Sequence, residues 1–234
     1  MSFNHRRRIF LMRHGSVTYF DSTGKPFLPE SVPLNEQGRE QASAAGKVFA
    51  QAGINFDRVI VSGLPRTIET ARRVLAETTQ KIDLQEWSDL VEIRGGRLSA
   101  IPDAELKEAF TGAFEGIAPE DKRFLGGESV GELMNRVHPA IDRLRSDTDW
   151  DTVLLVLHGG VNRAILSYAL TGQRIFMGNL AQTAGCINAM DVGEQHSDWV
   201  VRVVNYSPMS SLQAESRGTT MEALFHQYRK ARSL

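Results

Sequence analysis

Three short apolar runs in the chain each end in a cluster of polar residues and glycines. A short, continuous apolar run is typical of a strand buried on both faces of a parallel sheet. Ligands of open α/β sheets bind at the carboxyl ends of the strands, so the pattern predicts that the polar clusters share one site. The runs are 9–12, 59–61 and 153–157, and the clusters that follow them are Arg13-His14-Gly15, Ser62-Gly63-Leu64-Pro65-Arg66 and His158-Gly159-Gly160.

Helical periodicity fills the segments between the predicted strands. Apolar residues recur every three or four positions over 35–52 and 65–75, and Gly53 follows the first segment as a stop signal. A further helix is expected over about 161–170, directly after the last polar cluster. Residues 199–204 are rich in β-forming side chains and are expected to form the last strand.

One predicted helix contains a proline. Ser129 and Glu132 have the spacing of a capping box, and an apolar stripe follows them as far as Leu144. Pro139 lies inside this stripe, where a proline removes a backbone hydrogen bond. We therefore expect a kink or a broken turn at this position.

The alternation of strands and helices predicts a three-layer α/β/α sandwich around a mostly parallel sheet. With 234 residues and 41% hydrophobic content, the chain is expected to form a single domain over 1–234. Residues of about 95–127 are rich in glycine, proline and charge, and we expect them to form an insertion over the carboxyl edge of the sheet. Residues of about 213–234 have a helical pattern and are expected to form a C-terminal tail that docks on the domain or on another copy.

Composition narrows the classes of partner. A net charge of −1 with 24% charged residues provides no overall field that would attract nucleic acid or an anionic membrane, so neither is expected as a partner. Cys186 is the only cysteine, which excludes an internal disulfide and fits a reducing compartment. No segment has the length and apolar character of a membrane span, and we expect a cytoplasmic protein.

The predicted strand ends carry the side chains that phosphoryl transfer requires. This chemistry needs fixed positive donors around the phosphate oxygens and a nucleophile in line with the leaving group. Arg13 and Arg66 can each hold phosphate oxygens through two donors. His14 is a nucleophile near neutral pH if its imidazole is neutral. His158 provides a second imidazole, and the bare backbone of Gly159 allows an anion to approach a helix N-terminus.

The motifs that contain these residues resemble those of the histidine phosphatase superfamily, also called the phosphoglycerate-mutase-like family. An Arg-His-Gly tripeptide alone occurs often by chance, but several matched segments in the same order do not. The resemblance spans about residues 8–172. The matched segments are 11–15, 34–42, 62–71, 90–92 with Gly96, 126–129 and 158–163.

The resemblance implies a mechanism for each matched residue. It implies that His14 is transiently phosphorylated and that Arg13, Arg66 and His158 form the phosphate pocket. Glu92 corresponds to the general acid, which donates a proton to the leaving alcohol and then activates water. No metal and no other cofactor is expected, because two arginines and a histidine already provide the positive charge that magnesium supplies elsewhere.

The chain also departs from the pattern of this family. Many relatives carry Glu two positions after the nucleophile and Asn six positions after it, where this chain has Ser16 and Phe20. These changes leave the phosphate pocket intact and leave the identity of the substrate open. Thr18, Tyr19 and Asn162 lie near the motifs and are candidates for contacts with the rest of the substrate, although Asn162 could equally face solvent.

The same residues also have interpretations that do not involve catalysis or that assign the acid differently. Arg13 and Arg66 could form structural ion pairs. The general acid could be Asp89, Glu105 or Glu108 instead of Glu92. Four further histidines lack neighbours at metal-ligand spacing and are expected to be surface or packing residues: His5, His138, His196 and His226.

The most consistent interpretation is a phosphomonoester hydrolase of the histidine acid phosphatase type that acts on a small-molecule phosphate ester. Within the family, the alternative is a cofactor-dependent mutase of the phosphoglycerate type, which returns the phosphoryl group to its substrate. Outside catalysis, the alternative is a phospho-ligand binding protein on the same fold. Retention of both histidines, both arginines and a candidate acid argues against pure binding. The family resemblance also leaves a homodimer open.

Overall fold

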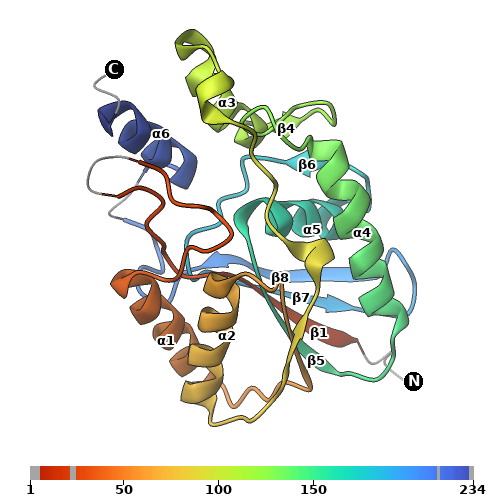
Figure 1. Ribbon diagram of the computed structural model, residues 1–234. Coiled ribbons are helices and arrows are strands. Elements are labelled where there is room, and N and C mark those ends of the chain that lie inside the picture. The colour runs from red at the N-terminus through yellow and green to blue at the C-terminus, as the bar shows by residue number, and fades with distance from the viewer. Residues whose placement is uncertain (1–5, 22–24, 215–216, 232–234) are drawn as a thin grey trace.

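A six-stranded sheet forms the centre of the computed structural model, which describes residues 6–21, 25–214 and 217–231. Its strand order is β3-β2-β5-β1-β7-β8. The first four of these strands are mutually parallel, and β7 runs antiparallel to β1 and to β8 (Figure 1). The strands are β1 (Arg7–Arg13), β2 (Arg58–Val61), β3 (Leu84–Glu86), β5 (Thr152–Leu157), β7 (Ile187–Val192) and β8 (Trp199–Tyr206).

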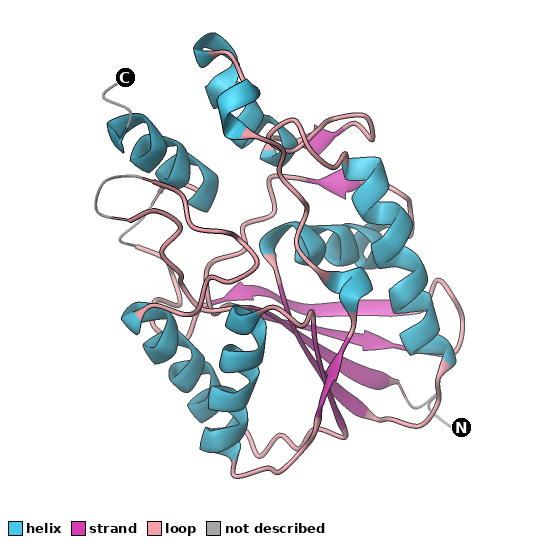
Figure 2. Ribbon diagram, viewed as in Figure 1, coloured by secondary structure: helices cyan, strands magenta, loops and turns pink. Residues whose placement is uncertain are grey.

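Helices cover both faces of the sheet, as Figure 2 shows. On one face lie α1 (Glu36–Gln51) and α2 (Pro65–Thr78), and on the other lie α4 (Val130–Ser146) and α5 (Gly159–Thr171). The predicted α/β sandwich with a mostly parallel sheet is therefore confirmed. In the described residues, no helix is both long enough and apolar enough to cross a membrane.

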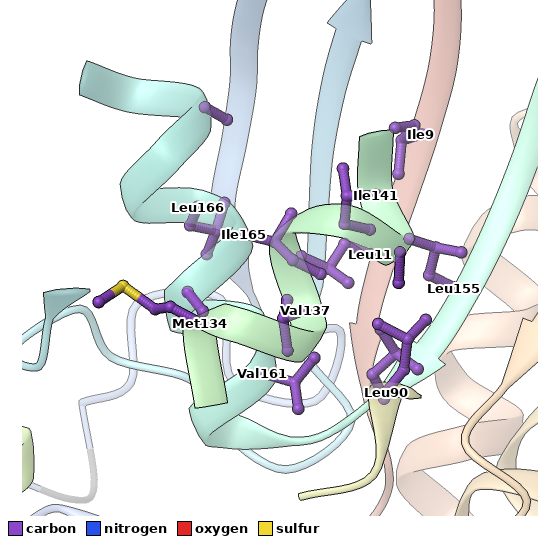
Figure 3. Packing of buried hydrophobic residues seen from close by; sticks show 14 of the residues in the cluster. Ile9, Leu11, Leu90, Met134, Val137, Ile141, Leu155, Val161, Ile165 and Leu166 are labelled. Carbon is purple, nitrogen blue, oxygen red and sulfur yellow. The ribbon is translucent and has the colours of Figure 1, made fainter. Parts of the chain in front are cut away.

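The two faces of β1 pack into separate cores because successive side chains of a strand point to opposite sides. Ile9 and Leu11 pack with α4 and α5 in the cluster drawn in Figure 3. Phe10 faces α1, where its ring meets Phe49 edge to face at 5.1 Å between centroids. Burial of both faces explains why the strand is a continuous apolar run.

Strand register brings the predicted site residues to one level of the sheet. Arg13 of β1 is paired with Leu157 of β5, so the next residues along, His14 and His158, leave the sheet side by side. On the other side of β5, Val61 of β2 is paired with Val156. The three polar clusters therefore meet at the carboxyl ends of neighbouring strands.

A broken turn at Pro139 is absent, because α4 is helical without interruption from Val130 to Ser146, and a kink there stays a prediction. Pro139 is exposed, and so is Asn135, whose carbonyl the proline leaves without a helical donor. Water can satisfy that carbonyl, while Val137 and Ile141 remain buried on the opposite side. Packing of the apolar face outweighs the local cost of the proline, which is about 3 kcal/mol.

Helices lie in both of the regions expected outside the sheet, the insertion and the tail, whereas a small two-stranded sheet was not predicted. Residues 95–127 contain α3 (Leu106–Thr111), short 3₁₀ turns and β4 (Ile117–Ala118), and β4 pairs with β6 (Phe176–Met177). The C-terminal helix α6 (Thr220–Ala231) lies beside α3 (Figure 1). Leu106, Phe110 and Tyr228 join these two helices in a small apolar cluster, which we call the cap cluster. The tail thus docks on the region that was expected to form an insertion.

Candidate active site

His14 and His158 form the centre of the candidate site. Their ring centroids are 5.2 Å apart with an angle of 65° between the ring planes. Only 2% of His14 and 0% of His158 is exposed. Both imidazoles follow directly from paired strands, so the fold fixes their separation.

The hydrogen bond of His14 assigns its tautomer. Nδ1 lies 2.7 Å from the backbone oxygen of Gly15, and because a carbonyl can only accept, Nδ1 carries the proton. The lone pair is therefore on Nε2. Burial, together with the charges of Arg66 and Arg13, lowers the pKa of His14 well below its ordinary value, which keeps the ring neutral. The geometry presents a neutral imidazole with a free nucleophilic nitrogen.

Glycine at two positions allows the His14 loop to lie against helix α1. A methyl group at Gly15 would overlap the backbone oxygen of Gly38, and one at Gly38 would overlap the backbone oxygen of Ser16. The amide of Gly15 also donates to Thr70 Oγ1 of α2 at 3.1 Å. The loop after the histidine is thus held by two helices, and its conformation depends on both glycines.

Arg13 and Arg66 are bound in the same way. Nη1 of Arg13 donates to the backbone oxygen of Gln182, and Nη1 of Arg66 donates to that of Pro29, each at 2.6 Å. Both residues are buried, with 8% and 2% exposed. Among the described residues the hydrogen bonds of both guanidiniums go to neutral oxygens and neither is paired with a carboxylate, so the interpretation as structural ion pairs is wrong.

His158 is oriented by Ser62. The hydroxyl of Ser62 lies 2.8 Å from Nε2 of the ring and 3.1 Å from the hydroxyl of Thr67. Burial, followed by the neighbouring His14 and the two arginines, lowers the pKa of His158 well below its ordinary value. The second imidazole of the site is therefore also neutral.

Three buried nitrogens at this site have no hydrogen-bond partner among the described residues. They are Nε of Arg13, Nε of Arg66 and Nδ1 of His158. A buried polar group without a partner costs about 1–3 kcal/mol, and more when it is charged. The charge of the two arginines and the donor capacity of all three side chains suit an oxyanion such as phosphate, which has several acceptor oxygens.

Glu92 joins this group through the first turn of α5. Its carboxylate accepts from the amide of Gly160 at 3.0 and 3.2 Å, and from the amide of Ile93 at 3.0 Å. A Cβ atom added at Gly159 would lie 3.7 Å from both Arg13 Nε and Glu92 Oε2. Arginine, carboxylate and helix terminus therefore meet around Gly159.

The alternative acids lie in other surroundings. Asp89 is paired with Arg143 at 3.4 Å, and Glu108 is paired with Lys122. Glu105 is exposed in a 3₁₀ turn of the region 95–127. Of the four candidate acids, Glu92 is the one bonded to the backbone that follows His158.

Asn162 lies against the backbone of this group, whereas Thr18 lies in the loop after the nucleophile. Asn162 is fully buried. One terminal atom of its side-chain amide lies 3.0 Å from Gln182 Oε1 and 3.3 Å from the Arg13 amide nitrogen, and the other lies 3.1 Å from the His158 backbone oxygen. The alternative that Asn162 faces solvent is therefore wrong. Thr18 is exposed in the loop after the nucleophile, with its hydroxyl 3.3 Å from Asn35 Nδ2. The position of Thr18 leaves a contact with substrate open.

The remaining histidines match the expectation of surface and packing roles, apart from His5, which lies outside the described residues. His138 packs on the ring of Tyr168 at 5.1 Å. His196 is exposed and lies 3.4 Å from Asp142. His226 is exposed on α6. In the described part of the chain, no three metal-ligating side chains are grouped together.

Two contacts that support the site had no signal in the sequence. Arg136 of α4 donates to the backbone oxygens of Asp89, Val91 and Glu92, at 2.7, 2.7 and 3.1 Å, and so holds the segment that carries the candidate acid. The backbone oxygen of Gln182, in the loop before β7, accepts the hydrogen bond from Nη1 of Arg13. Both join segments far apart in the sequence, and no spacing rule would have found them.

Comparison with known proteins identifies a family for the chain. A family model described as histidine phosphatase superfamily (branch 1) matches residues 9–206. The adenosylcobalamin/alpha-ribazole phosphatase of Salmonella typhimurium is 30% identical over 193 residues, which cover 80% of this chain and 91% of that protein.

Two further similarities cover different shares of the compared proteins. The 6-phosphofructo-2-kinase/fructose-2,6-bisphosphatase of Gallus gallus is 29% identical over 167 residues, or 70% of this chain and 33% of that protein. The chain thus spans about a third of the length of this relative. A phosphoglycerate mutase from Bacillus anthracis has a similar structure, with a TM-score of 0.64, 18% identity, and coverage of 91% and 98% of the two chains. That likeness shows the fold alone.

Proposed function

The chain belongs to the histidine phosphatase superfamily and is a phosphatase-type enzyme, and from this premise we propose that it hydrolyses phosphate monoesters through a phosphohistidine on His14. The observation that carries the proposal is the hydrogen bond from Nδ1 of His14 to Gly15, which leaves the lone pair on Nε2. The unpartnered nitrogens of Arg13, Arg66 and His158 support it, because they provide donors for the phosphate oxygens.

The first step transfers the phosphoryl group to the enzyme. The lone pair of His14 Nε2 attacks phosphorus in line with the ester oxygen, and the bond from phosphorus to that oxygen breaks. Protonated Glu92 donates its proton to the leaving oxygen, which departs as an alcohol. Arg13 and Arg66 balance the charge on the equatorial oxygens during this transfer.

The second step releases phosphate. Glu92, now a carboxylate, takes a proton from water, and the water oxygen attacks phosphorus as the bond to Nε2 breaks. His158 donates from Nδ1 to a phosphate oxygen when the hydroxyl of Ser62 donates to its Nε2. The charge comes from protein side chains in both steps, so the mechanism as proposed needs no metal, and turnover should be unchanged by a chelator.

An acid phosphatase-like subtype fits the electrostatics of the nucleophile. The pKa of His14 is lowered well below its ordinary value by burial and by Arg66 and Arg13. The ring therefore keeps its lone pair at pH values where an ordinary histidine is protonated. This supports activity that extends below neutral pH.

Trapping of the intermediate tests the mechanism. The protein is incubated briefly with p-nitrophenyl phosphate that carries a radioactive phosphoryl group, and the reaction is stopped with alkali. We expect an acid-labile radioactive phosphoryl group on the wild-type protein and none on His14→Asn. His196→Asn is the matched control, because this exposed histidine lies outside the site and its variant should carry the same label as wild type. Equal turnover by His14→Asn would refute the mechanism.

The same assay separates hydrolysis from the two alternatives. A phospho-ligand binding protein would bind phosphate without forming the label. A mutase, supplied with 3-phosphoglycerate and a bisphosphoglycerate, would yield 2-phosphoglycerate instead of free phosphate. A panel of alpha-ribazole phosphate, fructose 2,6-bisphosphate and sugar monophosphates then addresses the substrate, since two relatives are named for such esters.

A further inference from the structure

The C-terminal helix α6 begins at the phosphate site. Its first residue, Thr220, lies 2.9 Å from Nη1 of Arg13 through its hydroxyl oxygen, which accepts a hydrogen bond. This contact joins residues 207 positions apart in the sequence. The tail thus meets one of the two arginines assigned above to phosphate binding.

The contact completes the hydrogen bonding of one end of the guanidinium. Nη1 of Arg13 has two hydrogens, and its two acceptors are the backbone oxygen of Gln182 and the hydroxyl of Thr220. The guanidinium is planar, so holding both hydrogens of Nη1 fixes the plane of the whole group. The opposite edge of the guanidinium, which includes the unpartnered Nε, is then held in an orientation in which it can bind an anion. Arg66 has a carbonyl acceptor at Nη1 but no such hydroxyl among the described residues.

The position of Thr220 is fixed from both ends of α6. At the start of the helix, Thr219 and Glu222 form reciprocal bonds, with Thr219 Oγ1 accepting from the amide of Glu222 at 3.1 Å and Glu222 accepting from the amide of Thr219 at 2.6 Å. Further along the helix, the ring of Tyr228 packs on Phe110 at 5.7 Å and on Phe20 at 6.1 Å. The hydroxyl therefore reaches Arg13 from a helix that is anchored in the cap cluster.

We propose that Thr220 is a positioning residue for phosphate binding: its hydroxyl holds the plane of the Arg13 guanidinium, and α6 is therefore part of the active site. The proposal rests on the proposed function, because it assumes that Arg13 binds the phosphoryl group. Thr220 acts through Arg13 and forms no bond to the reacting atoms.

Three variants of the full chain test the proposal. Thr220→Val keeps the shape of the side chain and removes the acceptor, Thr220→Ser keeps the acceptor, and Thr219→Val weakens the start of α6 without touching Arg13. Binding of inorganic phosphate is measured by isothermal titration calorimetry, and KM and kcat are measured with p-nitrophenyl phosphate. We expect Thr220→Val to weaken phosphate binding about tenfold, the scale of one hydrogen bond to a charged group. Thr220→Ser should retain most of the affinity. Thr219→Val loosens the start of the helix but leaves the acceptor in place, so it should lose less affinity than Thr220→Val.

The pattern across the variants separates positioning from stability of the tail. Equal affinities of Thr220→Val and wild type would overturn the proposal, and so would an equal loss in Thr219→Val, because either result removes the specific role of the Arg13 contact. Failure of Thr220→Ser to retain affinity would overturn it as well. A wild-type protein that binds phosphate but forms no phosphohistidine would instead defeat the proposed function, and the binding comparison would still decide the role of Thr220.

Discussion

The strand-end site and the cap cluster are built by different means. His14, Arg66 and His158 are held by the backbone of paired strands and by the helices that follow them, and at most 2% of each is exposed. The cap cluster joins α3 and α6 through side chains, and its buried residues are Leu106, Phe110 and Tyr228. The candidate catalytic groups therefore lie on the part of the molecule with the larger buried cores, whereas α3 and α6 are joined by few buried residues.

This difference predicts two levels of stability. A region with a small buried apolar cluster opens at a lower free energy than the main core. The cores on both faces of the sheet are continuous, whereas the cap cluster is separate from them. We expect α3 and α6, which the cap cluster joins and which we call the cap, to open locally while the strand-end site remains folded. Such opening would let substrate enter a site whose candidate catalytic groups are already in place.

The largest effect is expected from Arg66→Lys in the strand-end site. Lysine keeps the charge but cannot bind both Pro29 and two phosphate oxygens with one planar group. We expect kcat/KM to fall by about 10²–10³, which corresponds to loss of a fixed donor at the phosphate. Arg72→Lys, an exposed position on the same helix, is the matched control and should leave kcat/KM unchanged. Comparable losses in both variants would contradict the role of Arg66.

Gly38→Ala should disturb the same site through the backbone. The added methyl group overlaps the backbone oxygen of Ser16, which belongs to the loop after the nucleophile. We expect the free energy of unfolding to fall by about 2–3 kcal/mol, measured by urea denaturation, and turnover to fall with it. Gly131→Ala in α4 is the control, because the nearest neighbours of its added carbon, all atoms of Glu120, lie at 3.0–3.1 Å, against 2.1 Å at Gly38. A Gly38→Ala protein as stable as Gly131→Ala would show that the loop tolerates displacement.

The strand-end site was predictable because its signals are local. Each functional side chain follows an apolar run directly, and neighbouring parallel strands bring their carboxyl ends together whatever the loops do. The expected strands before His14 and His158 are present, and so are the helices that open with Pro65 and Ser129. Periodicity and capping patterns require only the residues of one segment.

The elements that were missed depend on contacts between distant segments. Strand β7 was not predicted because Asn188 and Asp191 interrupt its apolar pattern, although both are buried. Asn188 is satisfied by donating to the backbone oxygen of Leu11, a partner that no local rule identifies. The contacts of Arg13 with Gln182 and Thr220 are of the same kind. Sequence patterns located the candidate reacting groups together with Ser62, but not Gln182 and Thr220, which orient Arg13.

Acidification should weaken the strand-end site through its two histidines. The pKa of His14 is lowered by burial, Arg66 and Arg13, and that of His158 by burial, His14 and the two arginines. In the unfolded chain both titrate near about 6.5, so below that pH the unfolded state binds more protons than the folded state. The stability is therefore complete above about pH 6.5 and falls as the pH decreases towards the lowered values, by up to about 1.4 kcal/mol per pH unit for each histidine.

Urea unfolding at about pH 7.5, 6.5 and 5.5 measures this dependence, in a range where most carboxylates remain ionised. Replacement of one buried histidine, as in His158→Asn, should roughly halve the slope. His196→Asn is the control, and the slope should be unaffected because this histidine is exposed. A flat stability between pH 7.5 and 5.5 in wild type would show that the two imidazoles are not held neutral by the fold.

The smallest effect is expected from Phe110→Ala in the cap cluster, and it tests the contrast between the two regions directly. Phe110 is 2% exposed and packs on Phe225 and Tyr228, each at 5.7 Å between ring centroids. If the cap opens before the core unfolds, loss of this ring should increase hydrogen exchange in α3 and α6 and raise KM about threefold to tenfold. The midpoint of global urea unfolding should change little, because the open cap already exposes the ring.

Leu155→Ala provides the matched comparison, since Leu155 is fully buried in the cluster on the α4 and α5 face of the sheet. Its global free energy of unfolding should fall by about 2–5 kcal/mol, the usual cost of a cavity in a core. If Phe110→Ala lowered global stability by a similar amount, the cap would unfold together with the core. The cap would then not open at a lower free energy than the core. Local opening of α3 and α6 could not explain how substrate enters the site.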